Sequence, residues 1–352
     1  MDFNQSPFLV IWELTRACGL ACRHCRGEAI PGRDPAELGT DEGKRLLDDV
    51  AEMGTPILIL SGGDPLERPD LEALVRHGKA AGLRVGTIPA ATEKLTRARL
   101  RALKEAGLDQ LALSLDGPEQ AIHDEFRGTP GAFEKTLQAA RWAAEEGLPL
   151  QVNTCIGPWN MGRLDGMISL VKSLGIVFWE VFFLVPVGRG RGLENLRPEQ
   201  FEAVFDRLHR LSLEKRFIVK VTEAQHYRRF VMQREDSAEK VRDILARPRG
   251  AGGSLGQSPV AVNAGKGFAF VDHRGKVFPS GFLPIEGGDV RQRPLSGIYR
   301  EAGVFRELRD PSLLRGRCGA CSFREVCGGS RARAFALTGD YQETDPCCAY
   351  QP

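Results

Sequence analysis

The amino-acid sequence predicts an α/β fold in which parallel strands alternate with crossover helices. Between residues 8 and 184, six short apolar runs rich in β-forming residues alternate with segments of helical periodicity. The runs are nearly continuous in apolar residues, as expected of strands buried on both faces of a sheet. They span 8–14, 56–61, 83–90, 108–115, 148–155 and 177–184. Six such units form either an open doubly wound sheet or a partial barrel, and periodicity alone does not separate these architectures.

The segments between the strands carry the signals that begin and end helices. Thr40 and Thr96 stand at predicted N-cap positions, and two acidic residues follow Thr40 in the first turn. Five helical segments are followed by a glycine where a C′ residue ends a helix, namely Gly54, Gly82, Gly107, Gly147 and Gly175. In both architectures ligands bind at the carboxyl edge of the sheet. We therefore expect the functional residues in the loops after the first, second, fourth and sixth strands.

Beyond residue 190 the sequence predicts a helix, a short strand and a second helix, then a glycine-rich linker, a β-hairpin and another helix ahead of a cysteine-rich tail. The corresponding residues are 198–246 for the helix–strand–helix unit with its strand at 217–222, 248–256 for the linker, 267–271 and 276–278 for the hairpin, and 295–309 for the last helix. A chain of 352 residues is long enough for two domains at roughly 150 residues each.

Composition and charge argue against several classes of protein. The chain has 48 Lys and Arg against 46 Asp and Glu, and its net charge of +2 gives no electrostatic support for binding nucleic acid or a membrane surface. No apolar run approaches the roughly 18 to 20 residues that span a bilayer, and the N-terminus lacks the basic and apolar regions of a signal peptide. We therefore expect a cytoplasmic protein that binds neither nucleic acid nor membranes.

The nine cysteines are clustered, which in a reducing compartment indicates metal binding rather than disulfides. The motif Cys18-x3-Cys22-x2-Cys25 lies on the loop after the first predicted strand. Three thiolates hold a four-iron cluster with one iron left open for an external ligand, as a catalytic cluster requires. From the spacing alone, a zinc site or an electron-transfer cluster with a distant fourth ligand is an alternative.

Residues 12–25, WELTRACGLACRHC, resemble the cluster loop of the radical S-adenosylmethionine (SAM) enzymes, whose hallmark is this cysteine spacing. The resemblance implies a partial (β/α)6 barrel of the TIM type, a [4Fe-4S] cluster on the three cysteines, and SAM as cofactor. It also implies reductive cleavage of SAM to a 5′-deoxyadenosyl radical that abstracts hydrogen from a substrate. His24 stands where many members carry an aromatic residue, and we expect it to pack over the cluster rather than ligate it.

Further segments resemble SAM-binding motifs of this family over residues 8–190. The GGDP segment after the second strand resembles the family's GGE segment, which receives the amino group of SAM, although a plain strand-to-helix turn is the alternative. A serine and an aspartate after the fourth strand resemble the ribose-contacting segment, and two residues on or after the fifth and sixth strands match positions that contact the carboxylate, ribose or adenine. The implied SAM-binding residues are Ser61, Gly62, Gly63, Asp64, Pro65, Ser114, Asp116, Asn153 and Arg189.

The tail contains a second cysteine pattern, Cys318-x2-Cys321-x5-Cys327, followed by Cys347 and Cys348. Four thiolates also suit a structural zinc ribbon. The pattern resembles the SPASM or twitch extension of radical SAM enzymes, a small α+β domain in which it holds an auxiliary [4Fe-4S] cluster. The family's Asp-Pro-x-Cys placement favours Cys348 as the last ligand, with Cys347 as the alternate.

Serines stand where a full SPASM domain has cysteines for a further cluster. These are Ser280 and Ser330, so we expect two [4Fe-4S] clusters in total, one that binds SAM and one auxiliary cluster that transfers electrons. Cys155 is expected to be a small buried apolar residue. The resulting division is 1–215 for the radical SAM barrel, 216–258 for a helical connection and linker, and 259–352 for the SPASM/twitch-like domain.

Two substrate classes follow from the resemblance. The start of the barrel and the single auxiliary cluster resemble the branch that modifies tetrapyrrole propionates in alternative haem and haem d1 synthesis. A peptide maturase that forms crosslinks or thioethers is the alternative, although only 17 residues precede Cys18, where such enzymes often carry a leader-binding domain. A flavodoxin or ferredoxin is the expected electron donor. An iron-sulfur electron carrier is the non-enzymatic alternative.

Four tail arginines are candidate ligands of substrate carboxylates, and solvated side chains that offset the thiolates are the alternative. They are Arg315, Arg317, Arg331 and Arg333.

Overall fold

The computed structural model describes residues 1–245 and 261–352, and the predicted glycine-rich linker lies outside these ranges. All six predicted parallel strands are confirmed, and each pairs in parallel with the next along the chain. They are β1 (Leu9–Glu13), β2 (Ile57–Ser61), β3 (Arg84–Thr87), β4 (Gln110–Ser114), β5 (Leu150–Ile156) and β6 (Phe178–Phe183). The third strand ends earlier than predicted, because Pro89 has no N–H to donate to the sheet.

The sheet continues beyond these six strands at both edges. The strand predicted at 217–222 is β7 (Ile218–Thr222), which pairs in parallel with β6. At the other edge β8 (Phe268–Val271) pairs in parallel with β1, followed by the antiparallel β9 (Lys276–Phe278) and β10 (Gly288–Asp289). The sheet order is therefore β10-β9-β8-β1-β2-β3-β4-β5-β6-β7. Strand β7 thus pairs with β6 across the predicted boundary at residue 215, and β8 pairs with β1 across the one at residue 258. The division of the chain at these positions stays a prediction.

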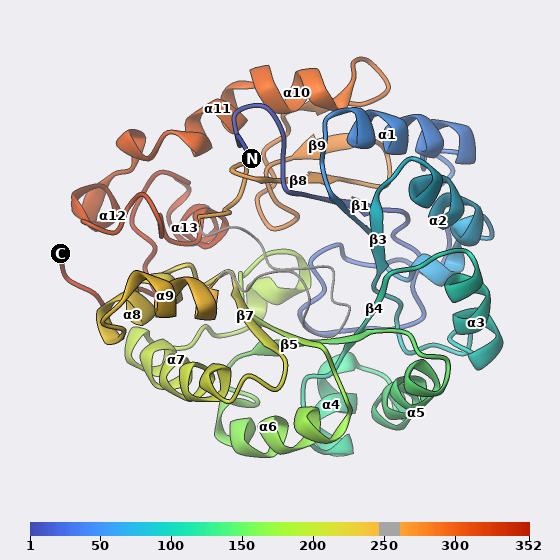
Figure 1. Cartoon of the computed structure of the whole chain (residues 1–352), viewed down its shortest axis with the longest axis horizontal. Helices are drawn as coiled ribbons and strands as arrows, with labels where there is room; N and C mark the ends of the chain where they lie inside the picture. Colours follow the sequence, from blue (N-terminus) through green and yellow to red (C-terminus); the bar gives the residue numbers. More distant parts are fainter. Residues whose placement is uncertain (246–260) are drawn as a thin grey trace.

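Helices surround the curved sheet on its outer side (Figure 1). In chain order they are α1 (Thr40–Glu52), α2 (Leu71–Ala80), α3 (Arg97–Glu105), α4 (Gln120–Arg127), α5 (Ala132–Glu145), α6 (Leu164–Ser173), α7 (Pro198–Leu213), α8 (His226–Arg234) and α9 (Ala238–Leu245). Short 3-10 helices lie at η1 (Pro65–Glu67), η2 (Met161–Arg163), η3 (Gly188–Gly192) and η4 (Pro311–Leu313). No helix among the described residues is long and apolar enough to cross a membrane.

The helix signals in the sequence are mostly confirmed. The five predicted C′ glycines all have positive φ, and Thr96 accepts a hydrogen bond from the N–H of Arg99 as an N-cap does. The prediction for Thr40 is wrong, because Gly39 is the N-cap and its N–H donates to the carboxylate of Glu42 at 2.8 Å. The Thr40 hydroxyl instead donates to Asp70 at 2.7 Å, which ties α1 to the start of α2.

The chain after β10 first packs against β10 and against α1. The single helix predicted at 295–309 is two helices, α10 (Leu295–Glu301) and α11 (Gly303–Arg309), because Ala302 is extended. The turn lets Phe305 pack on Tyr299, with ring centroids 5.2 Å apart. Two further helices, α12 (Gly316–Ala320) and α13 (Arg331–Thr338), lie among the tail cysteines, above α8 in the view of Figure 1.

Candidate functional site

The structure brings most of the predicted SAM-site residues to one cavity at the carboxyl edge of the sheet. The cavity measures about 240 Å³ and lies between the loop after β1 and the ends of β2 to β6. Its lining includes Cys18, Cys22, Cys25, Ser61, Gly62, Gly63, Ser114, Asp116, Asn153 and Arg189. We call it the cysteine-lined cavity. Asp64 and Pro65, which were predicted for the same site, do not line it.

Backbone hydrogen bonds hold the cysteine loop in place. The N–H of Cys18 donates to the carbonyl of Ile30 at 3.0 Å, which closes the loop at its base. The thiol sulfurs also accept backbone hydrogen bonds, Cys18 from Leu20 and Cys25 from Ala29, both at 3.4 Å. Burial raises the pKa of the Cys18 thiol to about 12, and a metal that binds such a thiol replaces its proton. Sulfurs that accept N–H bonds and face an open cavity fit an iron-sulfur cluster.

The two glycines after β2 lie directly against the cysteine loop. The N–H of Gly63 donates to the carbonyl of Thr15 at 2.7 Å. A Cβ at Gly63 would stand 2.4 Å from the carbonyl oxygen of Ala17, and one at Gly62 would stand 2.8 Å from that of Thr15. Glycine is therefore required at both positions for the end of β2 and the cysteine loop to share one cavity wall.

The carboxylate of Asp64 forms hydrogen bonds within the protein and does not line the cavity. It accepts hydrogen bonds from the N–H of Leu66 at 3.0 Å, the N–H of Ala90 at 3.3 Å and the hydroxyl of Thr92 at 2.8 Å. The side chain is fully buried, and this burial raises the pKa of the carboxyl group. Asp64 thus caps the short helix η1 and shapes the loop after β3. Ala90 of that loop, and not Asp64, lines the cavity.

Asp116 belongs to a buried charge network that reaches the cysteine loop. One carboxylate oxygen accepts the N–H of Cys155 at 2.7 Å, and the other forms an ion pair with Arg127. Arg127 also donates to the sulfur of Cys22 at 3.6 Å. Burial opposes the charge of Arg127, but the Asp116 carboxylate and the Cys22 sulfur raise its pKa. Sequence reasoning missed Arg127, because an arginine at the end of a helix is common and nothing in its spacing marks it.

The remaining residues around the cavity support the loop from its other side. The guanidinium of Arg189 donates to the carbonyl of Cys22 at 3.0 Å, and the backbone N–H of Arg189 donates to the carbonyl of Cys25 at 3.1 Å. Asn153 lines the cavity and accepts a hydrogen bond from Gln151 at 2.6 Å. His24 stacks on Phe126 with ring centroids 4.4 Å apart, and burial lowers its pKa to about 4. His24 is therefore a neutral packing residue in this structure.

A second cavity lies inside the barrel and adjoins the first. It measures about 270 Å³ and is lined by alternate residues of the strands, and we call it the barrel cavity. Its wall at β1, β2 and β8 is apolar, with Leu9, Ile11, Ile57, Ile59, Phe268 and Phe270. Its wall at β4 to β7 is mixed: the polar residues there are Gln110, Gln151, Glu180, Lys220 and Thr222, and the apolar ones are Ala112, Phe178, Phe182 and Val221. The two cavities share Arg26, Ser61, Ile88, Phe182 and Phe282, so a molecule in the barrel cavity abuts the cysteine-lined one.

The tail cysteines lie together around a third, smaller cavity. Its lining includes Cys318, Cys321, Cys327 and Cys348, but not Cys347. Cys347 is buried in the main apolar core instead. Among the described residues, no three Cys, His, Asp or Glu side chains gather closely enough to hold a single metal ion.

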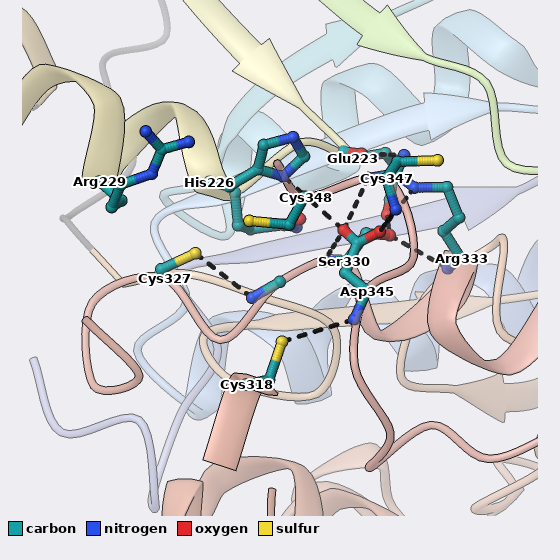
Figure 2. Close-up of polar contacts among 12 residues, drawn as sticks. Glu223, His226, Arg229, Cys318, Cys327, Ser330, Arg333, Asp345, Cys347 and Cys348 are labelled. Atoms are coloured by element: carbon teal, nitrogen blue, oxygen red, sulfur yellow. Dashed lines mark hydrogen bonds and ion pairs between the residues drawn. The ribbon is translucent and has the colours of Figure 1, made fainter. Parts of the chain in front are cut away.

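A buried ion pair fastens the tail cysteines to the end of β7 (Figure 2). Arg333 and Asp345 are both fully buried and form two hydrogen bonds, at 3.0 and 2.7 Å. The Asp345 carboxylate also accepts the N–H of Ser330 at 2.9 Å, and the backbone N–H of Asp345 donates to the sulfur of Cys318 at 3.4 Å. Arg333 further donates to the carbonyl of Glu223, just after β7. The charge of Arg333 holds the pKa of Asp345 far below its usual range despite burial.

The two serines noted in the sequence meet at one carboxylate. The hydroxyl of Ser330 donates to Glu223, and Ser280 hydrogen-bonds the same side chain. Burial raises the pKa of Glu223. Ser280 and Ser330 are therefore joined through Glu223 in a Ser–Glu–Ser contact.

The four tail arginines all have partners within the tail or the end of the barrel. Besides Arg333, Arg331 donates to the carbonyls of Tyr341 and Glu343, and Arg315 pairs with Asp340. The fourth, Arg317, donates to the carbonyls of Cys348 and Tyr350. None of the four lines the barrel cavity. The structure therefore does not place them where they would bind carboxylates of a substrate in that cavity.

Comparisons with known proteins agree with the fold and with the cysteine loop. Residues 12–171 match the model of the Radical SAM superfamily. The chain is 42% identical, over 99% of its own length and 98% of the relative, to an AdoMet-dependent heme synthase of Methanosarcina barkeri. It is 32% identical, over 98% of its length and 88% of the relative, to a PqqA peptide cyclase of Rhodopseudomonas palustris.

The fold also matches solved structures at low sequence identity. The structure of Streptococcus suis SuiB bound to S-adenosylmethionine superposes with a TM-score of 0.74 and 13% identity, over 98% of this chain and 78% of SuiB. This match supports the α/β fold with its parallel sheet. With the family match, the full-length relatives and the cysteine loop at the edge of the sheet, the chain belongs to the radical SAM superfamily, and it is an enzyme whose cofactors are SAM and a [4Fe-4S] cluster.

Proposed function

We propose that this radical SAM enzyme modifies the propionate side chains of a tetrapyrrole, by the oxidative decarboxylation expected for the haem branch. The observation that carries the proposal is the 42% identity, over nearly the whole of both chains, to an AdoMet-dependent heme synthase. The barrel cavity supports it, because an apolar wall together with one that carries polar side chains suits a flat macrocycle with carboxylate groups. The peptide alternative has weaker support, since the peptide cyclase relative is only 32% identical.

In this proposal Cys18, Cys22 and Cys25 hold the SAM-binding cluster. When bound, the cluster and SAM supply an electron and a 5′-deoxyadenosyl group that takes a hydrogen atom from the substrate. The N–H groups that donate to Cys18 and Cys25 stabilise their thiolates. The glycines after β2 let the backbone approach SAM closely, and Ser114 and Asp116 at the end of β4 provide hydroxyl and carboxylate groups for its ribose.

The tail cysteines Cys318, Cys321, Cys327 and Cys348 hold the auxiliary [4Fe-4S] cluster in this proposal. Four protein ligands leave no open iron, so the cluster serves electron transfer between the substrate radical and a protein partner. A flavodoxin or ferredoxin is the electron donor that we expect. The proposal places the protein in the cytoplasm, where thiols stay reduced.

Anaerobic reconstitution tests the cofactor content. We expect about eight iron atoms and as many sulfides per chain, because each cluster holds about four. Replacing Cys18, Cys22 and Cys25 together with alanine should leave about four iron atoms and abolish formation of 5′-deoxyadenosine from SAM under dithionite. Zinc without sulfide would refute the assignment of clusters, and SAM cleavage by the triple variant would refute the role of the cysteine loop.

Turnover tests the substrate class. The reduced enzyme, supplied with SAM and an iron porphyrin that carries propionates, should release carbon dioxide and form 5′-deoxyadenosine in step with the product. Mass spectrometry detects the loss of each carboxyl group. Absence of any mass change in the porphyrin, with modification of a peptide encoded by a neighbouring gene, would support the peptide alternative instead.

A further inference from the structure

The charged residues of the barrel cavity differ in how their charges are compensated. Arg26 pairs with Glu13 at 2.7 Å, and Lys220 pairs with Glu180 at 3.1 Å. Glu223 is bonded to the two serines and is favoured in its neutral form by burial. Each of these side chains is therefore already matched within the protein.

Arg228, on α8, is the exception among the charged residues that line this cavity. Its two terminal nitrogens donate to backbone carbonyls, one to that of Val326 at 2.8 Å and the other to that of Val262. No carboxylate pairs with it in the described part of the chain. A guanidinium has five N–H groups, so three are left without a protein acceptor among the described residues.

Arg228 faces the barrel cavity close to the sulfur of Cys327. Burial lowers the pKa of Arg228 to about 10, and the nearby Cys327 sulfur opposes that effect. The side chain still carries its charge at neutral pH. Arg228 therefore lies near one sulfur but pairs with no carboxylate among the described residues, and a planar guanidinium with free N–H groups that faces a cavity suits a carboxylate.

The place of Arg228 in the barrel cavity also fits a substrate anchor. It is not among the residues shared with the cysteine-lined cavity, whereas Ser61, Ile88 and Phe182 are. A molecule anchored at Arg228 can therefore extend along the apolar wall toward the site of SAM cleavage. Through the carbonyl of Val326, Arg228 also contacts the loop that carries Cys327.

We infer that Arg228 binds a carboxylate of the substrate in the barrel cavity, and so positions another side chain of the same molecule at the cysteine-lined cavity. This inference rests on the proposed function for the identity of the carboxylate, a propionate of a tetrapyrrole. Arg228 replaces the tail arginines as the candidate carboxylate ligand, since none of those four lines the barrel cavity.

Binding of an iron porphyrin and of its fully esterified analogue tests the inference. Both are titrated into the reconstituted enzyme and followed by absorbance, and the result is the ratio of the ester Kd to the acid Kd. This ratio is measured on one preparation, so partial loss of folded protein does not change it. In Arg228→Gln we expect the ratio to fall roughly tenfold to a hundredfold, because a hydrogen-bonded charge is lost, whereas binding of the ester stays the same.

Two further variants complete the test. Arg228→Lys keeps the charge without the planar fork and should recover part of the preference for the acid. Arg234→Gln, on the exposed side of the same helix, should leave the ratio unchanged. An unchanged ratio in both Arg228 variants, with a wild-type enzyme that prefers the acid, would overturn the inference and leave the proposed function intact. A wild-type enzyme without preference or turnover would overturn both.

Discussion

The neighbours of three buried aspartates determine the role and the pKa of each carboxylate. Asp64 accepts three hydrogen bonds and caps a short helix, Asp116 pairs with Arg127 at the cavity, and Asp345 pairs with Arg333 beneath the tail cysteines. Burial raises the pKa of Asp64, whereas the arginine lowers the pKa of each of the other two despite their burial. Only Asp116 of the three lines the cysteine-lined cavity.

The two adjacent cysteines of the tail provide a sharp test of the auxiliary cluster. We expect Cys348→Ala to lower the iron content by up to about four atoms per chain, since Cys348 lines the cavity with the other three tail cysteines. Cys347→Ala should keep the iron and lower only the thermal midpoint, because Cys347 is a buried core residue. Iron and sulfide analysis after anaerobic reconstitution measures both. Greater loss of iron in Cys347→Ala would show that the ligand is the other cysteine.

At the level of elements, the sequence predicted the strands well because their apolar runs are nearly continuous. Strand β5, for example, is buried along its whole length. The partners of β7 and β8 were not predicted, because pairing with β6 and β1 depends on how the sheet curves and not on local pattern. In the same way, Arg127 on α4 lines the cysteine-lined cavity and Arg228 on α8 lines the barrel cavity. The sequence alone does not show which residues of a helix face a cavity.

The turn after β2 is the element whose geometry the cavity depends on most. In Gly63→Ala the new Cβ would stand 2.4 Å from the carbonyl of Ala17, a backbone atom that moves only with the whole cysteine loop. We expect formation of 5′-deoxyadenosine to fall roughly tenfold to a hundredfold, because a displaced loop misplaces the reacting groups.

Gly32→Ala is the matched control for this change. A Cβ at Gly32 meets nothing within 4 Å, and the residue lies in the same chain segment after the cysteines. Its rate of 5′-deoxyadenosine formation should equal that of the wild type. Equal rates in Gly63→Ala and Gly32→Ala would show that the close packing of β2 on the loop has no part in SAM cleavage.

At the scale of the whole molecule, the cysteine-rich tail is joined to the barrel by buried polar contacts. Arg333 donates to the carbonyl of Glu223 after β7, and Asn263 donates to that of Gly329 at 2.9 Å. Arg228 adds its contact with Val326. These contacts set the tail cysteines beside the barrel cavity, as electron exchange with a substrate bound there would require.

The Arg333–Asp345 pair is the most buried of these links. Replacing Arg333 alone should therefore destabilise the protein more than replacing both residues. Arg333→Met leaves the Asp345 carboxylate buried without its cation, which costs about 3 to 5 kcal/mol. We expect a marked fall in the thermal midpoint and loss of the auxiliary iron, because Asp345 also bonds Ser330 and the sulfur of Cys318.

The double variant Arg333→Met/Asp345→Asn separates charge from packing. Asparagine keeps an oxygen that accepts the N–H of Ser330 and carries no charge that needs a partner. If the buried charge is what destabilises Arg333→Met, the double variant should have the higher thermal midpoint of the two and recover part of the auxiliary iron. If instead the double variant is less stable than Arg333→Met, the pair holds the tail through its geometry, and the carboxylate at position 345 matters for its hydrogen bonds rather than for its charge.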